Sequence, residues 1–218
     1  MFDAASPLDG LDLPAGFADR VGATPERLAD AEVFRRMLVE TNTAMNLVGA
    51  STLPVFWLRH FVDSAQLLWI EPEARVWADL GAGAGLPGIV LAILLKGREG
   101  AHVHLVESTA KRCAFLTRVV EALDLPATVH NARAESLRLT VDVVTARACA
   151  PLNRLLTFAE PYFRAGAKSL FLKGGGVDEE LADARKGWRF VSRILPSLSD
   201  DRGRVLAVSH VGRIGKKR

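Results

Sequence analysis

The chain contains very little cysteine. Cys113 and Cys149 are its only two among 218 residues, too few for a disulfide scaffold and at no spacing that metal ligands adopt. The five histidines form no H-x-x-x-H pattern either. We therefore expect a reducing compartment and no bound metal.

Long apolar runs are also missing. The longest, residues 89–95, is far shorter than the roughly 20 residues that cross a bilayer. Residues 1–13 carry Asp3, Asp9 and Asp12 where a signal peptide would begin with basic residues. These absences predict a cytoplasmic protein that has no contact with a membrane.

A strong charge of one sign is absent as well. The net charge is only +3, which is a mild indication of polyanion binding and no more. The most basic segment is the chain end at residues 213–218, which either contacts phosphate or remains solvated.

What the sequence does contain is a helical first part. Thr24 suits an N-cap and Pro25 the first helical position, and apolar residues follow at helical spacing up to Met45. A second helical stretch is expected over residues 53–68. We expect residues 1–72 to form a helical extension that packs on the remainder, residues 73–218, as one compact unit.

After Pro72, short apolar runs alternate with helical segments, which predicts an α/β fold with a doubly wound, mainly parallel, Rossmann-like sheet. The turn-like residues 199–203 separate the last two strands and favour an antiparallel end of the sheet. The expected strands are 76–80, 102–106, 127–130, 141–146, 169–172, 190–194 and 205–209, and the helices between them are 87–95, 110–123, 152–162 and 178–187.

A glycine-rich loop follows the first of these strands. It reads Asp79-Leu80-Gly81-Ala82-Gly83-Ala84-Gly85-Leu86-Pro87-Gly88. Glycines let a backbone turn sharply and approach a ligand closely, and doubly wound sheets bind ligands at the carboxyl ends of their strands. We predict a cofactor site there that includes Asp79, Gly81, Gly83 and Gly85.

The glycines alone do not identify the cofactor. Gly83 to Gly88 also satisfies G-x-G-x-x-G, the dinucleotide fingerprint, so an NAD-dependent oxidoreductase remains an alternative. Asp79 favours S-adenosylmethionine, because a carboxylate at the strand end attracts a cationic cofactor and repels a pyrophosphate. Glu107, at the end of the next strand, suits the hydroxyls of a ribose with either cofactor. Residues 131–135 follow the third strand, where an adenine edge would lie.

Several blocks of sequence resemble the bacterial small-subunit ribosomal RNA guanine-N7 methyltransferases, the glucose-inhibited division protein B family. The blocks occur in order over roughly residues 25–210, and R-H-x-x-D-S ahead of a glycine loop ending in L-P-G is the most specific pair. They are residues 45–48, 59–64, 79–88, 108–112, 134–135, 146–148 and 172–174.

The resemblance implies a class I S-adenosylmethionine-dependent methyltransferase fold and methyl transfer to guanine N7 in 16S ribosomal RNA, free or in the small ribosomal subunit. It also implies cofactor contacts at Gly81, Leu86, Ala134, Glu135 and Arg147. Two positions depart from the family: Ala82 replaces a common hydroxyl residue, and residues 148–151 are smaller than usual. Neither change removes a charged or glycine position.

Basic residues near the carboxyl edge are the candidates for chemistry and RNA binding. Guanine N7 carries no proton, so its methylation needs no general base, and we expect the two cysteines to be buried or incidental. Arg147 and Lys173 are the predicted catalytic residues, contacting substrate, phosphate or the cofactor carboxylate. A structural ion pair and a plain surface lysine are the respective alternatives. The predicted RNA contacts are Arg59, His60, Lys111, Arg112 and Lys173.

Three further readings of the chain stay open at this point. One is the oxidoreductase, the second is a non-catalytic RNA-binding module with a relic cofactor pocket, and the third is methylation of a small molecule. We expect a monomer.

Overall fold

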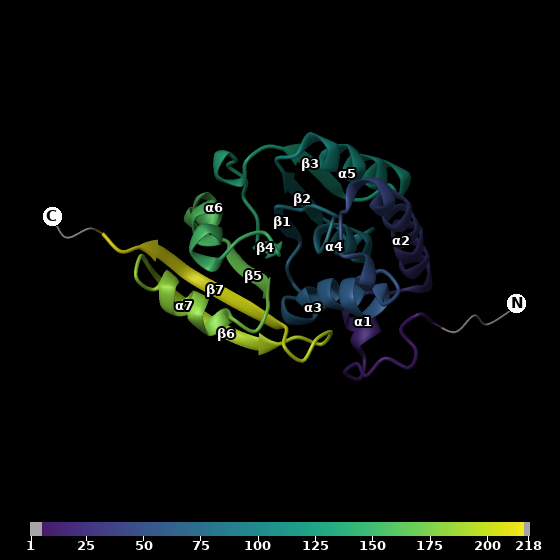
Figure 1. The fold of residues 1–218 in the computed structure, drawn as a ribbon, viewed down its shortest axis with the longest axis horizontal. Helices are drawn as coiled ribbons and strands as arrows, with labels where there is room; N and C mark the ends of the chain where they lie inside the picture. The colour runs from purple at the N-terminus through teal and green to yellow at the C-terminus, as the bar shows by residue number, and fades with distance from the viewer. Residues whose placement is uncertain (1–5, 216–218) are drawn as a thin grey trace, which may run out of the picture.

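A twisted seven-stranded sheet runs through residues 6–215, the part of the chain that the computed structural model describes (Figure 1). The strand order is β3-β2-β1-β4-β5-β7-β6. Neighbouring strands from β3 to β5 are parallel, and β7 is antiparallel to both β5 and β6. The strands are β1 (Val76–Leu80), β2 (His102–Glu107), β3 (Ala127–Asn131), β4 (Val143–Arg147), β5 (Lys168–Lys173), β6 (Trp188–Pro196) and β7 (Arg204–Arg213).

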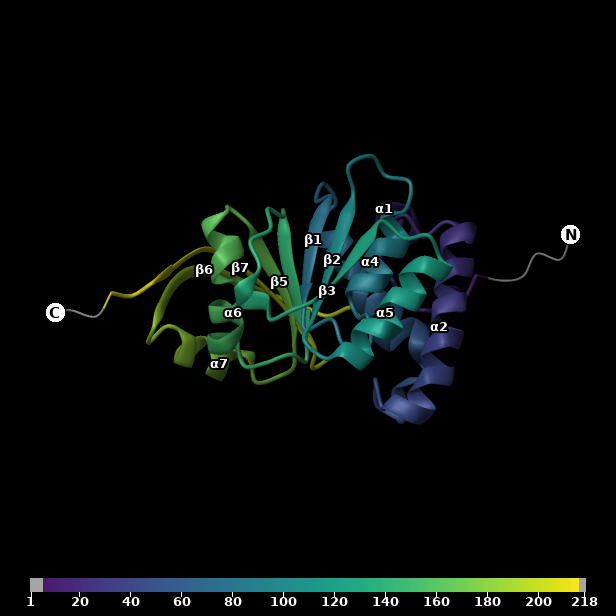
Figure 2. The ribbon, with the colours of Figure 1, turned by 90° about the horizontal axis from the view of Figure 1, so that it is seen from above.

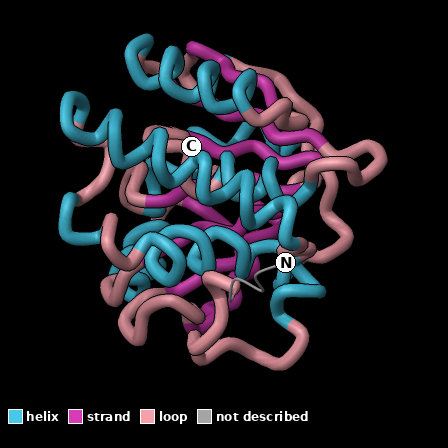
Figure 3. The backbone as a smooth tube through the Cα atoms, turned by 90° about the vertical axis from the view of Figure 1, so that its right-hand side faces the viewer, coloured by secondary structure: helices cyan, strands magenta, loops and turns pink. Residues whose placement is uncertain are grey.

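Helices cover both faces of the sheet (Figures 2 and 3). One face carries α3 (Asp63–Ile70), α4 (Gly88–Leu95) and α5 (Ala110–Ala122), with α1 (Phe17–Val21) and α2 (Pro25–Met45) outside them. The other face carries α6 (Leu152–Arg164) and α7 (Val177–Ala184). Short 3₁₀ turns occupy Ala50–Thr52 and Ala134–Ser136, and a π-helical segment, Trp57–Val62, leads into α3.

Alternating side chains of the strands supply two apolar cores, one on each face. Trp77 and Leu105 point into the core under α1–α5, whereas Ala78 and Val106 point into the core under α6 and α7. Both cores are made of nearly solvent-free side chains. The sheet is therefore held rigidly from both sides, and its carboxyl edge is a stable platform for a site.

The strand and helix pattern predicted after Pro72 is confirmed, with bounds that shift by a few residues. The antiparallel end is confirmed by β6 and β7. Thr24 caps α2, its hydroxyl oxygen accepting the Arg27 N–H at 3.4 Å, as expected. Because β1 pairs with β2 on one side and with β4 on the other, the order in which strands are added to the sheet reverses at β1, beside the glycine loop.

The single regular helix expected over residues 53–68 is wrong. The structure has a turn at residues 50–52, then the π-helical segment, and only then α3. A π-helical segment widens the turn by one residue and is often found at functional sites. The apolar spacing here fits either kind of turn, so the sequence does not reveal the change.

Two expectations concern parts of the chain that are only partly described. The basic end includes Lys216, Lys217 and Arg218, and the acidic start includes Asp3; these residues lie outside the described range. Between residues 6 and 215, no helix is long and apolar enough to cross a membrane. The same residues contain no group of three or more His, Cys, Asp or Glu side chains arranged to hold a metal ion.

Candidate active site

The glycine loop leaves β1 in a conformation that only glycine adopts easily. Gly81, Gly83 and Gly85 have φ angles of +72°, +54° and +86°. At Gly81, a Cβ atom would also lie 2.5 Å from the Cys149 sulfur, and at Gly85 it would lie 2.4 Å from Ile89. The loop therefore exposes bare backbone at Gly81 and packs tightly against α4 at Gly85.

Asp79 lies beneath this loop and is fully buried. Its Oδ2 accepts the Gly88 N–H at 2.9 Å, which ties β1 to the start of α4. Its Oδ1 has no hydrogen-bond partner in the described structure. Burial raises the pKa of Asp79 to about 7, against the opposing effect of the Gly88 N–H.

Glu107 fixes the loop from the neighbouring strand. Its Oε2 accepts the Gly83 N–H at 3.1 Å and its Oε1 accepts the Thr109 N–H at 2.7 Å. The side chain of Arg112 approaches Oε2 at 3.7 Å. Each carboxylate oxygen can accept more than one hydrogen bond, so Glu107 can hold the loop and still bind a hydroxyl group.

A small cavity opens beside Gly81 and Glu107, with a volume of about 100 Å³. Ala134 and Glu135 close it on another side, where the Tyr162 hydroxyl donates to the Ala134 carbonyl at 3.1 Å. Cys149 lines it too and is exposed, whereas Cys113 is buried; that Cys149 is incidental stays a prediction. Four of the predicted cofactor residues therefore surround one cavity.

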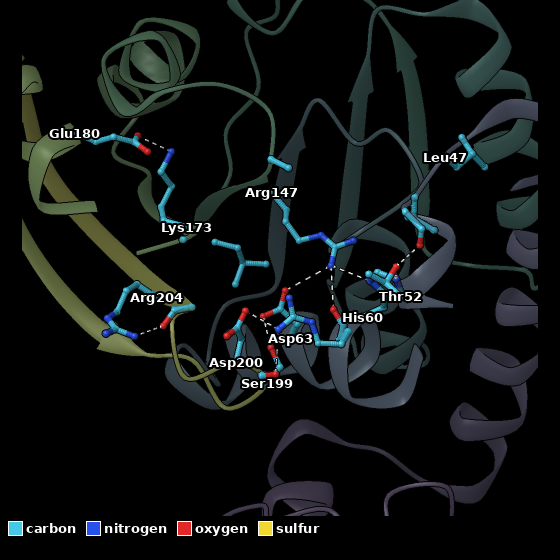
Figure 4. A pocket seen from close by; sticks show the side chains of 17 residues that line it. Leu47, Thr52, His60, Asp63, Arg147, Lys173, Glu180, Ser199, Asp200 and Arg204 are labelled. Carbon is cyan, nitrogen blue, oxygen red and sulfur yellow. Dashed lines mark hydrogen bonds and ion pairs between the residues drawn. The ribbon is translucent and has the colours of Figure 1, made fainter. Parts of the chain in front are cut away.

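A larger cavity of about 640 Å³ lies on the other side of residues 147–149 (Figure 4). Arg147 and Ala148 line it, whereas Cys149 faces the small cavity. The predicted residues Arg59, His60 and Lys173 line it as well. One short stretch of chain at the end of β4 thus separates the two cavities.

Arg147 is held by the R-H-x-x-D-S segment. Its Nη1 donates to the Arg59 carbonyl at 3.2 Å, to His60 Nδ1 at 3.0 Å and to Asp63 Oδ2 at 3.5 Å. His60 is buried, and burial, followed by the charges of Arg147 and Arg59, lowers its pKa to about 4. His60 is thus a neutral acceptor for the guanidinium.

Lys173 and Arg59 already have protein partners. The Lys173 ammonium donates to the Ala150 carbonyl at 3.1 Å and pairs with Glu180 at 2.6 Å. Arg59 pairs with Asp200. Either residue would have to exchange or share its carboxylate to bind a phosphate, so their RNA contacts stay predictions.

The remaining predicted residues lie away from both cavities. Gly83, Gly85 and Leu86 form the inside of the loop, and Leu86 is buried. Lys111 is exposed on the first turn of α5, beside Arg112. Glu107 compensates the charge of Arg112 at this helix start, which the sequence alone did not suggest.

Sequence reasoning missed several residues of the larger cavity. Arg204, at the start of β7, hydrogen-bonds only to the carbonyls of Asp201 and Gly203 within the described residues, so its charge is not paired with a carboxylate. No local pattern marks it, because the turn before β7 looks like any polar turn. The other missed lining residues include Thr52, Glu180, Ser199 and Asp200.

A sheet of this order, with its glycine loop at the switch point, defines a class I, Rossmann-like methyltransferase fold. Solved structures agree on the fold. A SAM-dependent methyltransferase from Aquifex aeolicus superimposes with a TM-score of 0.54 at 18% identity, covering 71% of this chain and 93% of that one. A mutant of MtNAS in complex with S-adenosylmethionine gives 0.52 at 19% identity, with 84% and 76% covered.

The chain belongs to the rRNA small subunit methyltransferase G family, whose model matches residues 27–201. The ribosomal RNA small subunit methyltransferase G of Caulobacter vibrioides is 59% identical over 92% of this chain and 93% of its own length. That of Methylorubrum populi is 45% identical, with 84% and 88% covered. The predicted family is confirmed, and the nicotinamide alternative is set aside.

Proposed function

We propose that this protein transfers the methyl group of S-adenosylmethionine to N7 of a guanine in 16S ribosomal RNA. The observation that carries the proposal is the pair of cavities on either side of residues 147–149. The small cavity offers a carboxylate and bare glycine backbone, and the larger one is lined by four cationic side chains and three carboxylates. The cations are Arg59, Arg147, Lys173 and Arg204. A cofactor and a polyanion can therefore meet at one point of the carboxyl edge.

The small cavity suits the nucleoside part of S-adenosylmethionine. Glu107 would accept the ribose hydroxyls, and the backbone at Gly81 and Ala134–Glu135 would lie against the remainder. Asp79 would act from below the loop, through its hold on the Gly88 N–H. When bound, the cofactor supplies an electrophilic methyl group on a cationic sulfur.

The protein's part in the chemistry is positioning. Because guanine N7 has a free lone pair and no proton, no side chain needs to act as a general base. Holding the two reactants in line supplies about 7–11 kcal/mol of the barrier in favourable cases. Arg147, at the wall between the cavities, is placed to orient guanine O6 or a phosphate.

The RNA target must present its guanine outside a regular duplex, since the major groove of A-form RNA is too deep and narrow for side chains. We propose that the partner is 16S ribosomal RNA or the small ribosomal subunit, as the name of the curated relatives suggests. We also propose that the protein works as a monomer in the cytoplasm. Lys111 and Arg112, on the first turn of α5, remain proposed RNA contacts.

Calorimetric titration tests the cofactor part of the proposal. We expect S-adenosylhomocysteine to bind and NAD not to bind. Binding of NAD alone would overturn the proposal, and binding of neither would favour the RNA-binding module with a relic pocket.

Alanine variants test whether Arg147 and Lys173 serve methyl transfer to RNA rather than cofactor binding. Arg147→Ala should lower the rate of methyl transfer to ribosomal RNA by roughly 100-fold and Lys173→Ala by about 10-fold, with S-adenosylhomocysteine affinity nearly unchanged, since both contact the substrate side. Lys186→Ala is the control, because this lysine is exposed on the end of α7 and pairs only with Asp183. Full activity of the Arg147 variant would remove that residue from the mechanism.

A further inference from the structure

Three segments that are distant in sequence meet at the side chain of Asp63 (Figure 4). They are the π-helical segment with the start of α3, the end of β4, and the connection between β6 and β7. Asp63 is mostly buried there, with a side-chain exposure of 15%, beside Arg147 with 19%. Charges interact strongly at such a site because little water screens them.

The two oxygens of Asp63 have different partners. Oδ1 accepts hydrogen bonds from the Ser199 hydroxyl at 2.7 Å, the Ser197 hydroxyl at 3.3 Å and the Gln66 amide at 3.0 Å. Oδ2 faces the Arg147 guanidinium at 3.5 Å. One carboxylate therefore connects the β6–β7 connection to the end of β4.

Gln66, one turn further along α3, also holds the β6–β7 connection against this helix. Its Oε1 accepts the Leu198 N–H at 2.9 Å, and its Nε2 reaches the Ser197 hydroxyl at 3.2 Å. The connection is thus anchored to α3 independently of the charge on Asp63. Removing that charge would leave part of this anchor in place.

Every hydrogen bond that the Arg147 side chain donates in the described structure comes from Nη1. Three acceptors, all from residues 59–63, surround this one nitrogen. The Nε and Nη2 groups have no acceptor within residues 6–215, and the side chain lines the larger cavity. These three contacts therefore hold the Arg147 guanidinium in place and leave the N–H groups of Nε and Nη2 for a ligand.

We infer that Asp63 is a positioning residue, which holds the Arg147 guanidinium at the wall between the two cavities. This inference rests on the proposed methyl transfer. Asp63 lines the larger cavity, but both of its oxygens already have protein partners, and it acts through Arg147. The carboxylate charge is the essential property, because the serine and glutamine contacts need only an acceptor oxygen, whereas a guanidinium is held best by an anion.

Asp63→Asn and Ser199→Ala distinguish the contact of Asp63 with Arg147 from its contact with the β6–β7 connection. Asp63→Asn keeps an acceptor oxygen for the β6–β7 connection but loses the charge that faces Arg147, so we expect kcat for methyl transfer to fall roughly 10-fold, with the KM for ribosomal RNA and the S-adenosylhomocysteine affinity within about two-fold. Ser199→Ala, which loosens only the connection, should lower kcat less than three-fold. Asp30→Asn, which breaks the distant Asp30–Lys96 pair, is the matched control.

A double-mutant cycle with Arg147→Lys shows whether Asp63 acts through Arg147. If it does, Asp63→Asn should have almost no further effect on kcat in the Arg147→Lys background. Equal losses in both backgrounds, or equal losses for Asp63→Asn and Ser199→Ala, would overturn the inference. Wild-type protein that binds S-adenosylhomocysteine but methylates no RNA would instead refute the proposed function, which the same assay reveals before any variant is compared.

Discussion

At the scale of single residues, His60 already has protein partners. We predict an RNA contact for it, with a structural hydrogen bond as the alternative, and the structure shows a ring that is engaged at both nitrogens. The Thr52 hydroxyl donates to the Gly49 carbonyl at 2.7 Å, so it accepts from His60 Nε2, which leaves Nδ1 as an acceptor for Arg147. The neutral tautomer with the proton on Nε2 satisfies all of these contacts.

The stability of the protein should therefore depend on the protonation of His60. Since the folded pKa is about 4 and the ordinary value is 6.5, the contribution is present above pH 6.5 and is lost as the pH falls towards 4. In His60→Asn, whose amide oxygen can still accept from Arg147, the drop in unfolding free energy between pH 7 and pH 5 should be about 1–2 kcal/mol smaller. Urea unfolding at both pH values measures this.

Two other histidines do not obscure the comparison. Burial also lowers the pKa values of His104 and His130, but they lie on β2 and β3 and contribute equally to both proteins. An identical pH dependence of the wild type and the His60 variant would show that His60 is not held neutral by its surroundings.

The individual site residues show where sequence reasoning succeeds. Gly81 and Glu107 could be located because each follows a strand, and strand ends converge at one edge of a parallel sheet. Ser199 and Arg204 could not, and neither could the contact of Asp63 with Arg147, because these roles depend on distant segments packing together. No local periodicity or spacing carries that information.

At the scale of elements, the connection from β1 to α4 combines two separate demands on its glycines. One is the positive φ angle, and the other is space. Gly85 faces both, since its φ is +86° and a Cβ would lie 2.4 Å from Ile89. Gly97, after α4, has a φ of +76° but open space around it.

Alanine substitutions at these two glycines should separate conformational strain from crowding. Gly97→Ala should cost about 1–2 kcal/mol of unfolding free energy, from the left-handed backbone alone. Gly85→Ala should cost roughly 2 kcal/mol more, because the start of α4 must shift as well, and it should weaken S-adenosylhomocysteine binding. Chemical denaturation and calorimetry test both statements, and equal costs for the two variants would contradict the crowding argument.

The apolar pattern of the sequence predicts the strands of this protein better than it predicts the kind of helical turn. Alternating and continuous apolar runs identified every strand of the sheet, because burial on both faces leaves a strong signal. The π-helical segment Trp57–Val62 escaped prediction, because its large apolar side chains pack as well with a wide turn as with a regular one. Yet this segment supplies two of the three acceptors that surround Arg147 Nη1.

At the scale of the whole molecule, residues from both parts of the chain share one core. Phe17, Phe34 and Phe61, from the first 72 residues, belong to the same buried cluster as Leu105 of β2 and Phe115 of α5. Figure 1 shows α2 beside α4 and α5. We propose that residues 1–72 and 73–218 unfold together, as expected of one compact unit.

A substitution in the middle of α2 tests this proposal. Phe34 is fully buried and lies 6.0 Å, ring to ring, from Phe56. Phe34→Ala should lower the unfolding free energy by about 3–5 kcal/mol, whereas Val55→Ala, at an exposed position, should change it by less than about 0.5 kcal/mol. Because the helices of the first part and the sheet share a core, far-ultraviolet circular dichroism and tryptophan fluorescence should report one coincident transition in the variant. The fluorescence comes from Trp57 and Trp69 in the first part and from Trp77 and Trp188 in the second. Two separate steps would instead show that the first 72 residues unfold on their own, and Arg147 would then lose its contacts with residues 59–63 while the sheet remained intact.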